Sequence, residues 1–422
     1  MMSAKLLPQK KAMSLRKAQI LTIVAAFLGW MFDGMEMGIF TLVARPSLLS
    51  MAPADVPSER FVQDWMGIIT AAFLLGAAGG GLLFGWLGDK IGRVKAMTLS
   101  IIFYSVFTGL CYFAQSPAQL GFFRFIAALG MGGEWSLGVA LVMEIWPTKL
   151  RPLMAGFIGV ASNVGFVIVG LMGIMWPATP ESWRWYFIVG AVPALLTFLI
   201  RIFVPESEKW KEAVKGKNIK PLKEIFVSPL LKPTLLATVF ASIPLLVIWG
   251  IVQWIPMWTD QMAGPGLPEA KGQSHFVVAF GGIVGSMLAP LLGHMFGRRF
   301  TYFLLCLLSF ISAYVLFMVF NQYSTSFMVA VFFVGVFTAS FFGWLPLYLP
   351  ELFPTRVRAT AQGVAFNAGR ILAAVGVLNM STIMAAFGGS YNKAGFAICV
   401  VYVVGMVLIW FAPETKNRPL PE

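Results

Sequence analysis

The sequence predicts an all-α integral membrane protein with twelve transmembrane helices in two six-helix bundles related by pseudo-symmetry. Three observations support this. Of 422 residues, 58% are hydrophobic and only 12% are charged. The apolar residues gather in runs long enough to span a bilayer, and the chain repeats itself once. A soluble chain of this length has too little polar surface to cover so much apolar material.

Twelve apolar runs predict the spanning helices, because about 20 such residues cross roughly 30 Å of hydrocarbon. The first run follows the basic tail KKAMSLRK. It is longer than the apolar core of a signal peptide and lacks a small-residue cleavage site, so we expect it to remain as a helix. Twelve spans place both termini on one side. The runs begin near residues 20, 65, 96, 118, 153, 185, 234, 276, 301, 326, 360 and 394.

Lysine and arginine positions predict the orientation, since basic loops tend to stay in the cytoplasm. With the N-terminus inside, 24 of the 31 basic residues, Arg201 among them, fall in cytoplasmic tails and loops, and 5 fall in the opposite loops. We therefore expect a plasma or inner membrane protein with both termini cytoplasmic. The remaining charges lie within the runs and need a reason; they are Arg124, Arg370, Asp33, Glu36 and Glu134.

Two pairs of similar segments reveal the repeat. EIWPTKLR at 144–151 recurs as ELFPTRVR at 351–358, and VPESEK at 204–209 recurs as APETKN at 412–417. In transporters built from parallel repeats, the substrate binds near the midplane between the halves. The predicted organisation is a cytoplasmic tail at 1–19, a six-helix bundle at 20–204, a Lys/Glu/Pro-rich cytoplasmic linker at 205–233, a second bundle at 234–412 and a cytoplasmic tail at 413–422.

GWLGDKIGR at 85–93 resembles the loop signature of the major facilitator superfamily, between its second and third helices. The paired E-x-x-P-T-x-x-R and PES/PET stretches resemble its sugar-porter-like branch. DGMEMGIF and FRFIAALGMGGEWSLGVALVMEIWP are most similar to the organic acid:proton symporters, in particular the sialate and aromatic-acid groups. The resemblance covers the whole chain and implies the major facilitator fold. The second-half loop GHMFGRRF departs from the signature, with Gly297 in place of its Asp, so a gate there would depend on Arg298 and Arg299.

Acids in the first run and an arginine in the fourth predict a proton-coupling site. Asp33 and Glu36 are three residues apart and share a helix face. At about 1.5 Å per residue, Asp33 and Arg124 reach similar depths, and an intramembrane arginine needs a counter-ion. We expect Asp33 to pair with Arg124 and to take up a proton when that contact weakens. Glu36 shares the proton or lines the path. The alternatives are a static Asp33–Arg124 ion pair that only orders the bundle and, for Glu36, a protonated structural acid.

Arg370, about 15 Å into the eleventh run, has no acid in the second-half spans to neutralise it. Its guanidinium fork suits a substrate carboxylate, and Asn367 faces the same way. The alternative is an ion pair with Asp33 or Glu36 across the halves. Glu134 is either a substrate contact or a hydrogen-bonding residue within GGEW. The other predicted substrate contacts are polar or aromatic residues of nearby helices, namely Asn163, Trp249, Gln253, Trp254 and Trp344.

The loop signature predicts a cytoplasmic gate. Asp89 can accept hydrogen bonds from a helix N-terminus of the other half, and a neighbouring charge cluster can hold the outward-facing state. One surface ion pair contributes little, but a network that breaks when the halves rock can bias two states. The predicted members are Gly85, Asp89, Arg93, Glu144 and Arg151 in the first half and Glu351, Arg356 and Arg358 in the second.

Other functional classes find no support in the sequence. The net charge of +13 comes from scattered basic residues, which disfavours nucleic acid as a partner. Three well-separated cysteines, and two histidines without acids or thiols at ligand spacing, predict neither disulfides nor a metal site. No nucleophile–base arrangement and no GxxxxGK[ST] loop is present, so we expect no enzyme. The protein should need no cofactor beyond a proton gradient and should act as a monomer.

The function predicted from these features is proton-coupled symport of a small organic carboxylate by alternating access. A uniporter or antiporter of sugars or other neutral solutes is the alternative. A non-transporting membrane sensor on the same fold is a more distant one. Substrate flux with proton uptake separates the first two, and ligand binding without flux identifies the third.

Overall fold

The computed structural model describes residues 15–55, 58–215, 220–264, 266–267, 269–379, 382–383, 386–388 and 390–422. Residues 1–14 of the predicted tail and 216–219 of the predicted linker lie outside this described part. Within it the chain forms helices and turns, and no strand occurs.

Among the described residues, the first half and the linker contain nine α-helices. They are α1 (Leu15–Ser50), α2 (Ser58–Ile91), α3 (Arg93–Leu110), α4 (Pro117–Met131), α5 (Glu134–Ile145), α6 (Arg151–Met175), α7 (Trp183–Arg201), and, in the linker, α8 (Glu208–Val214) and α9 (Pro221–Glu224). Two short 3-10 turns accompany them, at Cys111–Phe113 and Thr148–Leu150.

The described part of the second half repeats this order. Its α-helices are α10 (Leu231–Gly250), α11 (Ile255–Ala263), α12 (Ala270–Phe296), α13 (Arg298–Val319), α14 (Thr325–Ala339), α15 (Phe341–Tyr348), α16 (Arg358–Leu378), α18 (Tyr391–Cys399) and α19 (Val401–Leu408). Its 3-10 turns are Val252–Trp254, Leu349–Leu352, Thr355–Val357 and Ile409–Phe411.

The predicted spans match these helices. In the described part, eleven helical segments are long and apolar enough to cross a membrane. The predicted run near residue 185 coincides with α7, which has 19 residues. The protein is therefore a multi-pass membrane protein of the predicted fold class.

Two of the predicted runs are interrupted where the transport path is expected. The run near 118 divides into α4 and α5 at Gly132, where a Cβ would lie 1.9 Å from the Ala77 carbonyl oxygen of α2. The run near 234 divides between α10 and α11, because Ile251 leaves the helical conformation with φ −144° and Pro256 favours a helix start close by. Both interruptions place polar or aromatic side chains between the halves.

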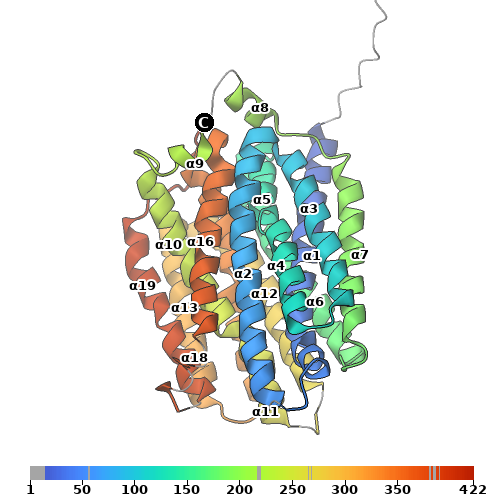
Figure 1. Ribbon diagram of the computed structural model, residues 1–422. Helices are drawn as coiled ribbons and strands as arrows, with labels where there is room; N and C mark the ends of the chain where they lie inside the picture. Colours follow the sequence, from blue (N-terminus) through green and yellow to red (C-terminus); the bar gives the residue numbers. More distant parts are fainter. Residues whose placement is uncertain are drawn as a thin grey trace, which may run out of the picture.

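The two halves lie side by side with their long helices roughly parallel (Figure 1). The start of α1, the C-terminus, α8 and α9 lie at one end, which we call the linker face. Helices α11 and α18 lie at the opposite end, which we call the vestibule face. Helix α6 packs against α12, and α2 packs against α16. These two pairs form the seam between the halves.

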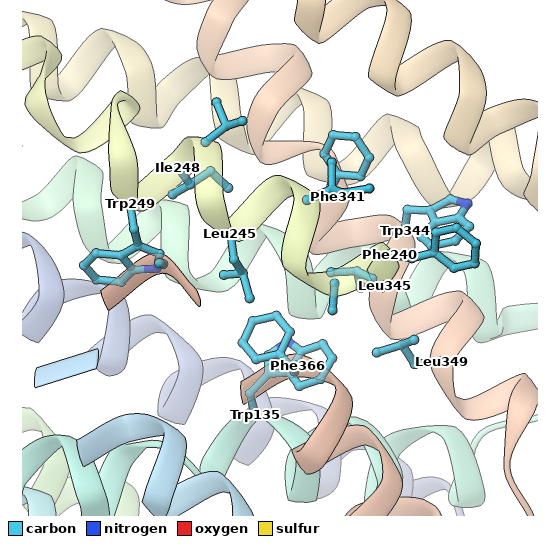
Figure 2. Close-up of a cluster of buried hydrophobic side chains, with 14 of the residues drawn as sticks. Trp135, Phe240, Leu245, Ile248, Trp249, Phe341, Trp344, Leu345, Leu349 and Phe366 are labelled. Carbon is cyan, nitrogen blue, oxygen red and sulfur yellow. The ribbon is translucent and has the colours of Figure 1, made fainter. Parts of the chain in front are cut away.

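Aromatic packing closes the centre of the seam. Trp135 of α5 stacks on Phe366 of α16, with ring centres 4.1 Å apart and planes at 17°. Figure 2 shows this pair beside Leu245, with Trp249 further along α10. The stack joins the two halves directly, so they are in contact at this depth.

Candidate transport site

Arg124 on α4 forms an ion pair with Glu36 on α1, with 2.8 Å between Nη1 and Oε1. The pair is buried, and the guanidinium carbon lies 4.3 Å from the ring centre of Phe40 and 4.8 Å from that of Phe73. The prediction that Arg124 pairs with Asp33 is wrong. Glu36 lies about 4.5 Å nearer the vestibule face than Asp33, and α4 starts at that face.

Asp33 is fully buried, and neither of its oxygens has a hydrogen-bond partner in the described part of the chain. No ion pair within 4.0 Å involves it there. It nevertheless lies within electrostatic range of Glu134, Arg370, Arg201 and Glu36. A buried carboxylate without partners is costly to keep ionised, so Asp33 is chemically suited to bind a proton.

Glu134 forms a buried ion pair with Arg201, the last residue of α7, at 2.6 Å. Neither the expected hydrogen bonding within GGEW nor the placement of Arg201 in a cytoplasmic loop is correct. Helix α7 remains helical up to Arg201, whose side chain turns inward and also donates to the Ala25 carbonyl at 3.2 Å. Gly29 on α1 leaves space for this pair, since a Cβ there would lie 2.0 Å from a Glu134 oxygen.

Arg370 and Asn367 share one face of α16, as predicted, and Arg370 donates to the Asn367 side-chain oxygen at 2.7 Å. The guanidinium is buried beside Phe366, at 5.0 Å from the ring centre. Among the described residues, no carboxylate lies within 4.0 Å of it, so the alternative ion pair with Asp33 or Glu36 is not formed here. Asp33 is the acid whose charge acts on Arg370.

An interior cavity of about 50 Å³ lies between the halves and is lined by Asn163, Gln253 and His275. Asn163 on α6 donates to the hydroxyl of Ser286 on α12 at 3.2 Å, so it bridges the seam. His275 is buried, and its Nε2 has no partner in the described part of the chain. Its cavity neighbours come from other helices, so sequence spacing gave no signal of this placement.

The predicted tryptophans lie in different places. Trp249 and Trp254 line a second small cavity, of about 30 Å³, together with Arg124 and Gln253. Trp344 lies in the second half's own core, where its indole nitrogen donates to the Arg298 carbonyl at 3.2 Å. In Figure 2 it lies beside Phe240, on the opposite side of the view from Trp249. The structure therefore does not bring Trp344 to the seam.

The loop signature makes the predicted contact with the other half. The Asp89 carboxylate accepts from the Thr360 backbone N–H at 2.8 Å and from its hydroxyl at 2.6 Å, in the first turn of α16. The Thr360 hydroxyl also lies 3.4 Å from the Gly85 carbonyl. These bonds satisfy a helix N-terminus that would otherwise lack an acceptor.

A buried charge network lies beside this contact. Arg93 pairs with Asp89 at 2.9 Å and with Glu144 at 3.1 Å, and it donates to the Thr355 carbonyl of the second half at 2.8 Å. Glu144 also pairs with Arg358 of the second half at 3.2 Å. The linker face is therefore closed by charged contacts that cross the seam.

The remaining predicted gate residues do not cross the seam by ion pairs. Glu351 pairs with Arg298 at 2.6 Å, within the second half. Arg356 pairs with Glu224 of the linker at 2.9 Å, and Arg151 donates to the Met143 carbonyl at 3.1 Å. The second-half cluster is thus not a mirror image of the first.

The structure also corrects the alignment of the two loops. Gly92 and Gly297 both have positive φ, 110° and 93°, immediately before the following helix, so they are equivalent. Arg93 donates to the Gly88 carbonyl and Arg298 to that of Gly293. The counterpart of Asp89 is therefore His294 rather than Gly297.

The PES and PET stretches, which mark the repeat in the sequence, also supply helix caps. Glu206 accepts from the backbone N–H groups of Arg93 and Val94 at 3.0 and 3.1 Å. Glu414 accepts from those of Arg298 and Arg299 at 3.0 and 3.2 Å. Burial raises the pKa of Glu206. For Glu414, backbone hydrogen bonds outweigh burial and lower the pKa.

The sequence model of the Major Facilitator Superfamily matches residues 22–377 of this chain. The chain belongs to this family. It is 27% identical over 404 residues to the sialic acid transporter NanX of Escherichia coli, covering 95% of this chain and 93% of that protein. It is 26% identical over 413 residues to the cis,cis-muconate transport protein of Acinetobacter baylyi, covering 93% and 94%.

A solved structure of the proton:xylose symporter XylE is similar in fold, with a TM-score of 0.80, 18% identity, and coverage of 96% of this chain and 98% of that one. The geometry is that of a major facilitator transporter closed at the linker face. At the vestibule face a cavity of about 770 Å³ remains between the halves.

Proposed function

We propose that this transporter is a proton-coupled symporter of a small organic carboxylate, with the linker face in the cytoplasm. The observation that carries the proposal is a pair of opposite charges without ion-pair partners. Asp33 in the first half and Arg370 in the second are both buried, and each lies within electrostatic range of the other. One can take a proton and the other can bind an anion.

Arg370 has the properties that a carboxylate site requires. Its guanidinium is fixed by Asn367 through one nitrogen, and the rest of the fork remains for a bidentate contact. Two relatives are described as transporters of muconate and of sialic acid, and both compounds carry carboxylates. This supports a carboxylate as the substrate class.

Coupling follows from the electrostatics of the two groups. While Arg370 carries no anion, its positive charge favours the ionised form of Asp33. A bound carboxylate neutralises that charge, and Asp33 then becomes costly to keep ionised in its buried position. Anion binding therefore promotes proton binding, and by linkage the proton promotes anion binding to the same degree.

The ion pair between Arg124 and Glu36 has a different role in this scheme. Because Glu36 already holds Arg124, the arginine does not compete for the charge of Asp33. The pair keeps an otherwise costly cation buried and shapes the small cavity that Trp249 also lines. We assign Asp33 as the proton carrier and Glu36 as a positioning residue.

Transport of labelled mono- and dicarboxylates into proteoliposomes, with and without an inward proton gradient, tests the proposal. Carboxylates should accumulate only when the gradient is present, and substrate entry should bring protons inside, which an internal pH dye records. Xylose and other neutral sugars serve as the comparison. Accumulation of sugars alone, or carboxylate flux that ignores the gradient, would refute proton-coupled carboxylate symport.

A further inference from the structure

A second buried acid lies on the linker side of Asp33, and the mechanism above gives it no role. Glu134 pairs with Arg201 at 2.6 Å, and both side chains are 1% exposed. The other carboxylate oxygen of Glu134 has no hydrogen-bond partner in the described part of the chain. This oxygen can therefore accept a proton without breaking an existing hydrogen bond.

One stripe of α1 connects the two acids. Thr22, Gly29 and Asp33 follow one another at spacings of seven and four residues, so they share a face of the helix. A Cβ on Gly29 would lie 2.0 Å from Oε1 of Glu134 and 2.4 Å from Nη2 of Arg201, so the ion pair lies against this glycine. Asp33 is one turn, about 6 Å, further from the linker face, and it lies within electrostatic range of Glu134.

A small cavity continues the stripe toward the linker face. It measures about 10 Å³, near the lower limit for one water molecule. Arg201 and Thr22 supply its polar lining. The Thr22 hydroxyl donates to the Ala18 carbonyl at 2.7 Å, and its oxygen can accept a hydrogen bond from water. The rest of the described lining belongs to α1, α3, α5 and the segment after α7, so the cavity lies inside the first half.

Glu206 lies where this route reaches the linker face. It follows Val204, a residue of the cavity lining, by two positions. Its carboxylate also accepts from the backbone N–H of Val94, another lining residue, at 3.1 Å. Glu206 is only half-buried, so water can reach it. The two acids, the cavity and Glu206 thus form a series from the centre of the first half to the linker face.

The charges around the two acids balance when neither acid is protonated. Among the described residues, the charged groups in electrostatic range of Asp33 are Glu134, Arg370, Arg201 and Glu36. Glu36 already has Arg124 as its partner, and Tyr104, which also lies in range of both acids, is uncharged at neutral pH. The remaining two acids and two arginines sum to zero. A monocarboxylate bound at Arg370 adds one negative charge, and one proton restores the balance.

We propose that Glu134 is a second proton site, which receives the proton from Asp33 and releases it to the linker face through the cavity beside Arg201. The proposal rests on the proposed function, because substrate binding loads the proton onto Asp33. In the transfer, the carboxyl O–H bond of Asp33 breaks and an O–H bond forms at the free oxygen of Glu134. Asp33 becomes a carboxylate, Glu134 becomes neutral, and the total charge is unchanged.

Release of the anion drives this transfer. Once the substrate leaves Arg370, the positive charge of that residue again favours an ionised Asp33, and the proton moves to Glu134. Arg201 favours the ionised form of Glu134, so the proton passes on to water in the cavity and the ion pair forms again. This route does not cross the seam. Substrate and proton therefore leave by different paths.

Two measurements separate the second proton site from the first. In the purified full chain in weak buffer, addition of cis,cis-muconate, or of whichever carboxylate shows the highest flux in proteoliposomes, should draw protons from solution, which a pH indicator records. Glu134→Gln should preserve this uptake, because Asp33 remains, and Asp33→Asn should lose it. In proteoliposomes with an inward proton gradient, both variants should lose accumulation and retain counterflow exchange.

A double variant tests for a purely structural role of the ion pair. Glu134→Gln alone leaves Arg201 as an unpaired buried cation and should lower the melting temperature. Glu134→Gln combined with Arg201→Gln removes both charges, so stability should recover while accumulation remains lost, because no acid is left at this position. The matched control is Glu208→Gln combined with Lys211→Gln, an exposed ion pair of α8, which should accumulate substrate normally.

Substitution of Thr22 tests the cavity as the exit. Thr22→Val keeps the shape of the side chain but removes the hydroxyl, so acidification of the vesicle interior during substrate entry should slow. Thr22→Ser keeps the hydroxyl and should release protons at the native rate. Equal rates in the native protein and both variants would overturn the exit through this cavity.

The outcomes separate this proposal from the proposed function. Accumulation by the double variant, or loss of carboxylate-induced proton uptake in Glu134→Gln, overturns the second proton site and leaves carboxylate symport through Asp33 intact. A native protein that takes up no proton with any carboxylate, and whose flux ignores the gradient, would overturn both.

Discussion

The two halves of the molecule share helix order and loop motifs but differ in their buried charges. In the described part of the first half, the mid-span charges are Asp33, Glu36, Arg124 and Glu134, and Arg201 reaches in from the end of α7. Among the described residues of the second half, the mid-span charge is Arg370. In the mechanism that we propose, this difference assigns proton binding to the first half and anion binding to the second.

The linker-face networks differ in the same way. Arg93 and Glu144 make contacts that cross to the second half. Their equivalents Arg298 and Glu351 pair with each other, and Thr415 of the same half donates to Glu351 at 2.6 Å. One network can report on the relative position of the halves, and the other stabilises a single half.

Asp33→Asn should have the largest effect. Gradient-driven accumulation should be lost, because the amide cannot exchange a proton, while counterflow exchange of substrate should persist. Protein yield and melting temperature should change little, since no hydrogen bond to Asp33 is broken. Glu36→Gln is the matched comparison, and it should lower the melting temperature by leaving Arg124 without its counter-ion. Normal accumulation by Asp33→Asn would exclude Asp33 as the proton carrier.

Substitution of Arg370 should weaken carboxylate binding, by roughly 10-fold for Lys and up to about 100-fold for Ala, because charge-assisted hydrogen bonds are worth about 1.5–3 kcal/mol. Binding is measured by titration with the transported acid and with its amide. The amide penalty should be large on the native protein and much smaller on Arg370→Ala. Arg356→Lys, at the partly exposed pair with Glu224, is the control. A full amide penalty on Arg370→Ala would place the anion site elsewhere.

Asp89→Asn should open the linker face, shifting the equilibrium about 10-fold or more through loss of charge-assisted bonds to Thr360 and Arg93. Ala178 lines the cavity at the vestibule face, so labelling of Ala178→Cys should slow as that cavity closes. Glu351→Gln should leave that rate unchanged while lowering the melting temperature, because its pair lies within one half. Equal slowing by both variants would show that both networks sense the seam.

The smallest expected effect is a loss of stability on substitution of Glu414, which caps the N-terminus of α13. Because the pKa of Glu414 is lowered in the folded protein, its contribution is present at neutral pH and is lost as pH falls through that lowered pKa. Glu414→Gln should therefore lower stability by about 0.5–1 kcal/mol at pH 7 and by less at acidic pH. Thermal unfolding across pH measures this, and a pH-independent loss would contradict the assignment.

The fold was predictable because each span is encoded locally, by a run of apolar residues whose length matches the bilayer. The ion-pair partners of individual buried charges were harder to predict. The Asp33–Arg124 prediction assumed straight helices with ends at the membrane surface, whereas α1 has 36 residues, about 54 Å. Its apolar run did not show which acid meets Arg124. Arg201 was missed because a basic residue at a helix end has the same sequence pattern whether its side chain turns inward or outward.

Cavity membership was the least predictable feature. Gln253 was expected near the path and lines two of the small cavities. His275 lines one of them without having been predicted there, and Trp344, predicted as a substrate contact, packs inside the second half. A tryptophan in an apolar run can pack in its own half or face the seam, and nothing in its neighbours along the chain separates these cases. The contacts depend on the rotation of each helix about its axis, which tertiary packing sets.

The stack of Trp135 on Phe366 gives the protein an intrinsic fluorescence probe of its conformation. One ring belongs to each half and the planes are nearly parallel, so we expect opening of the linker face to separate the rings and expose the indole to water. Indole emission moves to longer wavelength in water. In a variant that retains Trp135 as its sole tryptophan, opening of the linker face should therefore shift the fluorescence emission to longer wavelength. No attached dye is needed.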